Sequence, residues 1–218
     1  RALSDELAGV EAQLDAALAE LPNLPAPDAP LEDTVIKEVG AAGRGGRDHL
    51  ELAGPMIDME TAARVSGSRF AYLKGGLVML ELALVRFALE TLTAEGFEPV
   101  IPPVLVREAA LFGTGMLPDT EQQIYALPED ELYLVGTSEV ALASLHAGEI
   151  LAAGDLPRRY AGFSPCFRRE AGAAGKDTRG FYRVYQFMKV EQVVFCANDP
   201  EVSMAEHRLI LGNSEELL

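Results

Sequence analysis

The chain has 218 residues, of which 49% are hydrophobic, and its 34 acidic and 18 basic residues give a formal net charge of −16. No stretch approaches the roughly 18 consecutive apolar residues that a membrane-spanning helix needs, and so negative a surface repels phosphate backbones. We therefore expect a soluble globular protein with no membrane partner, and not a general nucleic-acid binder.

The cysteine content favours a reducing compartment. The chain contains only Cys166 and Cys196, which lack the spacing of metal ligands, and its first residues show no signal pattern. We expect both to be core thiols and the protein to be cytoplasmic.

The first predicted element is a helix whose apolar residues recur in alternating steps of four and three along residues 3–21. This heptad pattern is typical of a helix that packs on another helix. Because a lone helix of this length is marginal in water, we interpret it as the returning half of a longer antiparallel hairpin. An ordinary amphipathic helix on a globular body is the alternative.

A domain boundary is expected directly after this helix. The segment "LPNLPAPDAP", residues 21–30, has prolines at four of its ten positions, so it ends the helix and forms a stiff connector. We predict a helical arm over residues 1–21, a linker over 22–34 and a globular core over 35–218.

A nearly all-apolar helix is expected over residues 72–95, with Gly96 as its C-cap. A helix with so little polar surface must be covered on most sides, either inside the core or in a dimer interface. The next segment, "FEPVIPPVLV", is a short β-type run broken by Pro102 and Pro103. Because proline cannot donate to a β-ladder, we expect an edge strand or a strand that crosses to another subunit.

The second half of the chain alternates predicted strands and turns. We expect a strand over residues 131–139, a helix over 140–151 and two antiparallel strands between residues 166 and 195, joined by a long mobile loop. This order predicts an α+β fold, in which an antiparallel sheet is flanked by helices.

The last two strands carry many charges. In the strand expected over residues 181–195, the odd-numbered side chains share one face, because alternate side chains of a strand point to opposite sides. That face holds Arg183, Tyr185, Phe187, Lys189 and Glu191, whereas Val184, Met188, Val190 and Val194 point the other way.

The preceding strand adds Arg168 and Glu170, which are two residues apart and share a face. Arginine binds phosphate bidentately, an aromatic ring offers a stacking plane, and a carboxylate can hold an amine. The combined face fits ATP together with an amino acid. The alternative is a solvated sheet face with weak cross-strand ion pairs.

"FRREAGAAGKDTRGFYRVYQFMKVE" resembles the second signature motif of class II aminoacyl-tRNA synthetases, and specifically that of the seryl-tRNA synthetase family. Four other stretches agree with that family in order: "LPNLPAPDAP", "SGSRFAYLKGG", "GFEPVIPP" and "GTSE". The resemblance covers essentially the whole chain. It implies a class II synthetase-like antiparallel sheet flanked by helices, with the remnant of an N-terminal coiled-coil arm.

The resemblance also implies roles in binding ATP and Mg²⁺. Arg168 would grip the α-phosphate of ATP and the carboxylate of serine, and Glu170 would fix the adenine amino group. Phe187 would stack on the adenine and Arg183 would reach the distal phosphates, with the backbone near Val184 lining the site. No metal ligand is assigned within this chain.

For the amino acid, the resemblance implies that Thr137 binds the ammonium group of L-serine and that Glu139 supports the pocket. Glu191 would hold either the ammonium or the hydroxyl group of the substrate. The serine carboxylate, which is already ionised, would attack the α-phosphate in line and form seryl-adenylate without a protein base.

The resemblance further implies a third motif after residue 218 and most of a coiled-coil arm before residue 1, so that this chain alone would be only partly competent. The implied protein is a homodimeric serine–tRNA ligase that acts on tRNA(Ser) and dimerises through the first-motif helix and strand. Tyr185 stands where the family more often has histidine. Two alternatives stay open: a relative that activates serine for a non-tRNA acceptor, and a non-catalytic dimerisation or regulatory module.

Overall fold

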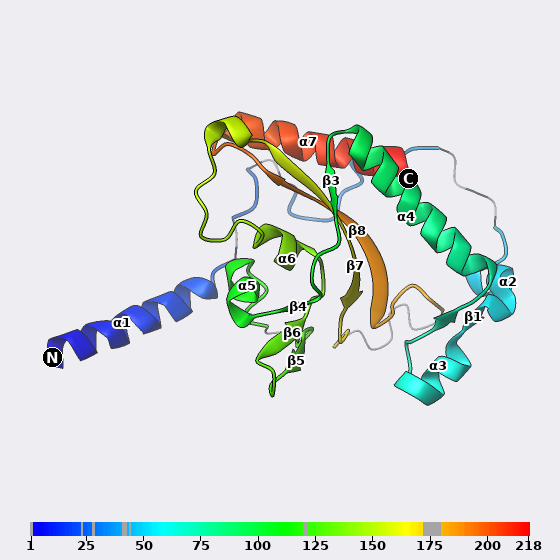
Figure 1. Ribbon diagram of the computed structural model, residues 1–218, viewed down its shortest axis with the longest axis horizontal. Coiled ribbons are helices and arrows are strands. Elements are labelled where there is room, and N and C mark those ends of the chain that lie inside the picture. Colours follow the sequence, from blue (N-terminus) through cyan, green and yellow to red (C-terminus); the bar gives the residue numbers. More distant parts are fainter. Residues whose placement is uncertain are drawn as a thin grey trace. The chain divides into compact units, whose positions relative to one another are not determined.

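The computed structural model describes residues 2–22, 24–27, 29–40, 43, 45–119, 122–171 and 180–218. They fall into two compact units, Arg1–Asp48 and His49–Leu218, and each is described here by itself. The helices and strands are labelled in Figure 1. In the described part of the chain, no helix combines the length and the apolar composition needed to cross a membrane.

The first unit contains one helix, α1 (Ala2–Ala19), among its described residues. It matches the predicted heptad helix closely, and the chain leaves the helix shortly before the proline-rich segment. The large apolar side chains of the heptad pattern, including Leu3, Leu7 and Leu14, are more than half exposed. The division into arm, linker and core stays a prediction.

The second unit contains the remaining elements. Its helices are α2 (His49–Ala53), η1 (Gly54–Met56), α3 (Met59–Ser66), α4 (Gly76–Ala94), α5 (Glu108–Gly113), α6 (Glu139–Ala143), η2 (Ala153–Asp155) and α7 (Pro200–Leu217). Its strands are β1 (Ile57–Asp58), β2 (Tyr72–Leu73), β3 (Glu98–Val100), β4 (Leu105–Val106), β5 (Tyr125–Leu127), β6 (Leu132–Leu134), β7 (Arg158–Phe167) and β8 (Gln186–Phe195).

The central sheet has the strand order β3-β7-β8. Strands β7 and β8 pair antiparallel over their whole length, from Arg158 opposite Phe195 to Phe167 opposite Gln186. The short β3 pairs parallel with β7 at the edge of the sheet and ends before Pro102 and Pro103, the residues on which this edge position was predicted. The predicted antiparallel pair and the edge strand are confirmed, but β7 ends at Phe167, so Arg168 and Glu170, which were predicted to lie in this strand, follow its end. Glu170 has a φ of +48°, outside strand geometry. Residues 172–179 of the predicted loop lie outside the described residues.

The two faces of this sheet are covered differently. Helices α4 and α7 lie along one face, where Leu92, Phe97 and Ala161 form a buried core with side chains of β8 and α7 (Figure 1). Helix α6 packs on the opposite face, where its fully buried Leu142 lies close to Gly162 of β7. Ala161 and Gly162, which are adjacent in β7, thus face opposite sides of the sheet, as strand geometry requires.

Helix α4 is shorter than predicted. The helix begins at Gly76, and the preceding residues Tyr72 and Leu73 instead form β2, which pairs antiparallel with β1. Gly96 ends the helix with a φ of +83°, so the predicted glycine cap is confirmed. Several large apolar side chains of α4 are exposed in this chain, namely Met79, Leu80, Leu82, Leu84 and Phe87.

A second, smaller antiparallel sheet has the order β4-β6-β5 and packs with α5 and α6 around Val106, Leu111, Val135 and Val140. Two predictions for this region were too long: the strand covers only Leu132–Leu134, and helix α6 ends at Ala143. A series of turns follows α6 and includes Gly148, whose φ is +78°. The short elements place the segment 135–139 between the two sheets.

Candidate active site

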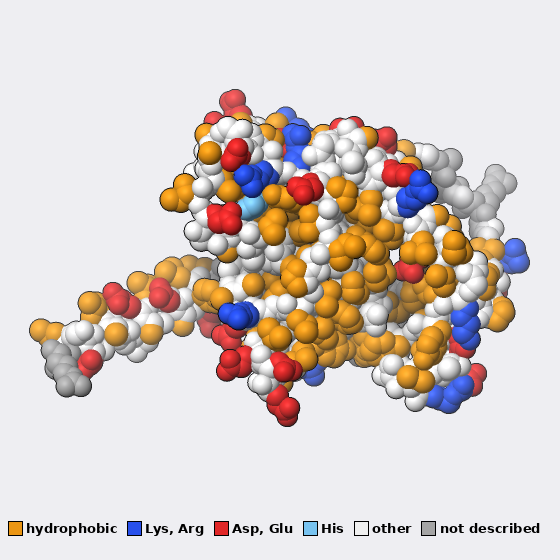
Figure 2. Space-filling view, in the orientation of Figure 1, with side chains coloured by type: hydrophobic (Ala, Val, Ile, Leu, Met, Phe, Trp, Pro, Cys, Tyr) orange, Lys and Arg blue, Asp and Glu red, His pale blue; other side chains and the backbone are white. Residues whose placement is uncertain are grey.

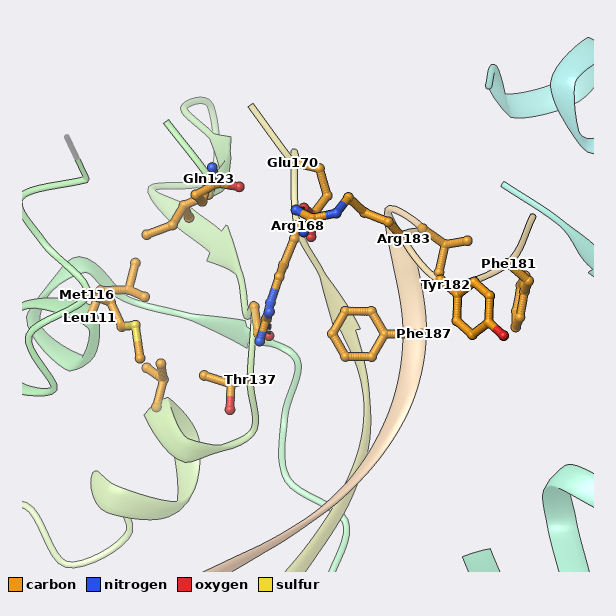
Figure 3. A pocket seen from close by; sticks show the side chains of 14 residues that line it. Leu111, Met116, Gln123, Thr137, Arg168, Glu170, Phe181, Tyr182, Arg183 and Phe187 are labelled. Atoms are coloured by element: carbon orange, nitrogen blue, oxygen red, sulfur yellow. Dashed lines mark hydrogen bonds and ion pairs between the residues drawn. The ribbon is translucent and has the colours of Figure 1, made fainter. Parts of the chain in front are cut away.

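A cavity of about 700 Å³ opens where the two sheets meet. Figure 3 shows that side chains that follow β7 or lie near the start of β8 face it from one side, and side chains of α5, α6 and the segments that flank the smaller sheet face it from the other. Its lining residues are Leu111, Met116, Gln123, Ile124, Gly136, Thr137, Val140, Arg168, Glu170, Phe181, Tyr182, Arg183, Val184 and Phe187.

The amide of Phe167 donates to the carbonyl oxygen of Val135 over 2.9 Å, and this bond joins the two sheets. The amide of Arg168 donates to the carbonyl oxygen of Tyr185 over 3.0 Å, which extends the pairing of β7 with the segment before β8. The first of these bonds holds the segment after β6 beside the end of β7. As a result, the Arg168 side chain reaches Gly136, where its Nε donates to the carbonyl oxygen over 3.2 Å.

Arg168 and Phe187 form the floor of the cavity. The guanidinium carbon of Arg168 lies 5.2 Å from the centroid of the Phe187 ring, within the range of a cation–π contact. The arrangement places a fixed positive charge beside an aromatic face (Figure 3). Such a pair can bind an anionic group and a flat ring side by side.

Glu170 and Arg183 lie at the rim. Their side chains form an ion pair, with Nη1 of Arg183 donating to Oε2 of Glu170 over 2.7 Å. Glu170 has a φ of +48°, a left-handed conformation that few non-glycine residues adopt and that is often found at functional sites. The pair places one charge of each sign at the mouth of the cavity.

The predicted strand that contains Arg183 was too long at its start. Strand β8 begins only at Gln186, so Arg183 and Val184 lie in the turn before it. Both residues line the cavity, although strand parity predicted that they point to opposite sides. The parity argument holds for Phe187, Lys189 and Glu191, which lie within the strand.

Glu191 is the centre of a hydrogen-bond network beneath the cavity. Its Oε2 accepts bonds from Oγ1 of Thr137 over 2.6 Å, from Oγ of Ser138 over 2.7 Å and from the amide of Glu139 over 2.9 Å. Its Oε1 accepts a bond from Nζ of Lys189 over 2.9 Å, and the same Nζ donates to Oγ1 of Thr137 over 2.6 Å. The network links β8 to the N-terminal end of α6.

This network keeps Glu191 ionised. Burial raises the pKa of the carboxyl, but hydrogen bonds from Thr137, Lys189 and Ser138 and the charge of Lys189 outweigh it, so the net pKa lies below its ordinary value. On β7, the fully buried thiol of Cys166 behaves in the opposite way, because burial raises its pKa. Near neutral pH Glu191 is therefore a carboxylate.

Residues 124–210 match the family model for the tRNA synthetase class II core domain (G, H, P, S and T). The chain is 49% identical to the serine–tRNA ligase of Streptomyces coelicolor, in an alignment that covers 96% of this chain and 53% of that protein. It is 50% identical to the serine–tRNA ligase of Micrococcus luteus, over 94% of this chain and 51% of the relative.

The chain belongs to the class II tRNA synthetases. Its fold agrees with a crystal structure of seryl-tRNA synthetase from Pyrococcus horikoshii complexed with ATP, with a TM-score of 0.88, 39% identity, and coverage of 99% of this chain and 54% of that one. The cytoplasmic serine–tRNA ligase of Naegleria fowleri in complex with AMP gives a TM-score of 0.86 at 29% identity, over 98% and 53% of the two chains. The chain thus spans about half the length of the relatives it matches.

In this class II synthetase chain, the predicted site residues are not all equally close to the cavity. All of them except Glu139 and Glu191 line it. Glu191 is joined to it through the buried Thr137 hydroxyl. Glu139 contributes its backbone amide to the network, while its side chain is exposed. The structure therefore brings the predicted residues into one connected region of this synthetase fold.

Two residues of this region were assigned no role from the sequence. Lys189 was placed on the charged face but without a function, and Ser138 was passed over between Thr137 and Glu139. Lys189 contacts Thr137, which lies 52 residues away in the sequence, and Ser138 contacts Glu191 across 53 residues. The position of Lys189 two residues before Glu191 on one strand face was the available signal.

The described residues of this synthetase do not fit a resident Mg²⁺ site. Among them, no three His, Cys, Asp or Glu side chains come together in a way that could hold a metal ion. The carboxylate that lines the cavity and the one in the network beside it are both engaged, Glu170 with Arg183 and Glu191 with Lys189.

Proposed function

We propose that the protein is a serine–tRNA ligase, which activates L-serine with ATP to seryl-adenylate and transfers the seryl group to tRNA(Ser). The observation that carries the proposal is the cavity in which the Arg168 guanidinium lies against the Phe187 ring and beside Thr137. The names of the relatives, which are serine–tRNA ligases, support the choice of serine and tRNA.

The proposed nucleotide site consists of the cavity floor and rim. Phe187 stacks on adenine, and Arg168 holds the α-phosphate together with the serine carboxylate. Glu170 binds the adenine amino group and Arg183 binds the distal phosphates. Each residue therefore replaces its partner in the present Glu170–Arg183 ion pair with a group of the ligand. The backbone beside Val184 closes the site. The relatives solved with ATP and AMP support a nucleotide here.

In the proposed reaction the serine carboxylate attacks the α-phosphorus of ATP in line and pyrophosphate leaves. The nucleophile is already ionised, so no side chain has to remove a proton. Arg168 neutralises the charge that develops on the α-phosphate, and the fixed positions of both substrates supply the rest of the acceleration. Mg²⁺ is expected to arrive with ATP as its complex, since the protein carboxylates are engaged.

The proposed serine site lies deeper, at Thr137, Glu139 and Glu191. The buried Thr137 hydroxyl faces the cavity and is joined to Glu191, so a substrate that reaches Thr137 also reaches the carboxylate network. The α-ammonium group of serine is assigned to Thr137, and the pocket is supported by Glu139.

We also propose a homodimer that forms through α4 and the adjoining β3 segment. Figure 2 shows hydrophobic side chains gathered over the face that carries α4. Exposed fractions of 67% for Met79, 58% for Leu84 and 81% for Ile101 are large for apolar residues of a monomer. Sedimentation equilibrium tests this proposal: a mass of two chains is expected, and a monomer at micromolar concentration contradicts it.

The predicted organisation completes the proposal. Residues 1–21 belong to a tRNA-binding arm, residues 22–34 to a linker, and residues 35–218 to a catalytic core. A cytoplasmic location stays a prediction of the sequence.

Serine-dependent exchange of labelled pyrophosphate into ATP tests the proposed activity, with threonine and alanine as control amino acids. Exchange with serine alone, followed by seryl transfer to tRNA(Ser), supports a serine–tRNA ligase. Exchange without transfer to tRNA points to a different acceptor. Binding of neither serine nor ATP points to a non-catalytic module and overturns the proposal.

A further inference from the structure

Arg183, at the rim of the cavity, lies in a short segment that belongs to no helix or strand. Residues 181–184 come just before β8, and Phe181, Tyr182 and Arg183 lie on the same side of the cavity (Figure 3). Because this segment lies outside the ladder between β7 and β8, contacts with other parts of the chain have to fix its position. The place of Arg183 at the rim depends on these contacts.

The first anchor lies after Arg183, at Tyr185. The amide of Tyr185 donates to the carbonyl oxygen of Arg69 over 3.2 Å. Its ring meets that of Phe70 edge-on, with 5.5 Å between the centroids, and lies 5.7 Å from the guanidinium carbon of Arg69. Arg69 and Phe70 belong to the stretch "SGSRFAYLKGG", which lies outside the cavity lining. This stretch therefore anchors the segment on its C-terminal side.

The second anchor lies before Arg183 and is made by His49, the first residue of α2. The Phe181 amide donates to Nε2 of His49 over 2.9 Å. The His49 ring also meets that of Tyr182, with 4.4 Å between the centroids and 63° between the planes. Gly180, whose φ is +85°, allows this approach, because a Cβ atom there would overlap the His49 ring. His49 thus contacts three consecutive residues of the segment.

The hydrogen bond to Phe181 is the main polar contribution of the His49 ring. Since Nε2 accepts a proton, it carries none itself, and the proton of the neutral ring lies on Nδ1. Nδ1 is buried and has no hydrogen-bond partner within the part of the chain that the structure describes. The ring is therefore held in a place where, among the described residues, its polar atoms serve only the Phe181 amide.

We propose that His49 is a positioning residue for nucleotide binding, which anchors residues 180–182 and thereby holds Arg183 where it can bind the distal phosphates of ATP. The inference rests on the proposed function, because it concerns the nucleotide side of the same cavity. His49 does not line the cavity and need not touch ATP. Its loss should weaken the binding of the distal phosphates and leave the sites for adenine and the α-phosphate in place.

The test compares ATP with AMP, which lacks the distal phosphates. Both nucleotides are titrated calorimetrically into the full chain. His49→Phe keeps an aromatic ring but has no acceptor, so it is expected to bind ATP about five- to tenfold more weakly, in line with one lost hydrogen bond, and AMP within about twofold of the wild type. His49→Gln places an acceptor oxygen near the position of Nε2 and should restore most of the ATP affinity.

His207→Phe is the matched control, because His207 is exposed on α7 and lies outside the cavity lining. It should bind both nucleotides like the wild type. Gly180→Ala disturbs the same contact from the other side, since its methyl group displaces the His49 ring, and it should show the same selective loss of ATP affinity. This second variant keeps the test decisive if His49→Phe does not fold, which circular dichroism reports.

A double variant shows whether His49 acts through Arg183. Arg183→Ala removes the guanidinium group and should by itself weaken the binding of ATP. If His49 only positions Arg183, adding His49→Phe to Arg183→Ala should cause almost no further loss of ATP affinity. Losses that simply add would mean that His49 affects ATP by another route, and they would overturn the proposal.

The remaining outcomes separate the inference from the proposed function. If the wild-type protein binds neither nucleotide, the proposed function fails. If it binds both, and His49→Phe and Gly180→Ala keep the wild-type ratio of ATP to AMP affinity, only the role of His49 is overturned. An equal loss of affinity for ATP and AMP also overturns it, since His49 would then support the cavity as a whole and not the position of Arg183.

Discussion

Replacing Gly162 with alanine should disturb the contact that holds α6 against the central sheet. A Cβ atom at position 162 would lie 2.4 Å from Cδ1 of Leu142 and 3.2 Å from Oγ of Ser138. Ordinary van der Waals contacts begin near 3.4 Å, so Leu142 must retreat by about 1 Å. Leu142 is fully buried and cannot swing into solvent.

The expected loss in the free energy of unfolding for Gly162→Ala is about 1–3 kcal/mol, the usual cost of overpacking a dense core. Urea unfolding of the wild type, Gly162→Ala, Leu142→Ala and the double variant measures it. Leu142→Ala alone should cost about 2–5 kcal/mol through the cavity it leaves. In the double variant the new methyl group occupies part of that cavity, so its loss should be at least about 1 kcal/mol smaller than the sum of the single losses.

Gly212→Ala in α7 is the matched control, because a Cβ atom there meets nothing within 4 Å. It should leave stability unchanged or raise it by about 0.5–1 kcal/mol, since alanine favours a helix over glycine. The packing argument is refuted if Gly162→Ala unfolds within about 0.5 kcal/mol of the wild type, or if the losses in the double variant simply add.

The ion pair between Arg159 of β7 and Glu206 of α7 should make stability depend on pH. Its hydrogen bonds of 2.6 and 2.8 Å lower the pKa of Glu206, so its stabilisation is present above the ordinary carboxyl pKa and is lost as the pH falls. Glu206→Gln should therefore be about 1 kcal/mol less stable than the wild type at pH 7, with a difference that shrinks towards pH 3; a constant difference contradicts this. A maleimide should label the partly exposed Cys196 much faster than Cys166, which is buried and whose pKa is raised by burial. Equal labelling of both thiols in the folded protein, measured by mass spectrometry, would contradict the described core.

The charged face of the last strand could be predicted from the sequence because strand geometry alone determines it. Phe187, Lys189 and Glu191 lie within β8, where side chains alternate strictly between the two faces. Arg183 precedes the strand, where a turn replaces the alternation, so its position next to Glu170 depends on tertiary structure. Parity is reliable only as far as the strand extends.

Other features of the site could not be read from the sequence. The contact of Lys189 with Thr137 joins residues from two different elements, and no local pattern distinguishes it from the other charges on the same face. The role of Gly162 could not be predicted either, because the absence of a Cβ atom matters only through the close approach of Leu142 in the folded chain. The sequence also failed to predict that α6 ends at Ala143. The apolar residues after Ala143 continue a helical pattern, but the structure forms a series of turns there.

The most direct test of the central claim, that this cavity holds ATP and serine together, is a calorimetric titration with a non-hydrolysable seryl-adenylate analogue. Binding to the wild type is expected, with a loss of about a hundredfold or more in affinity for Arg168→Ala if the guanidinium holds the phosphate. Arg158→Ala, which removes an arginine paired with Asp155 away from the cavity, should bind like the wild type. An analogue that fails to bind the wild type at millimolar concentration, or that binds Arg168→Ala equally well, would contradict the account.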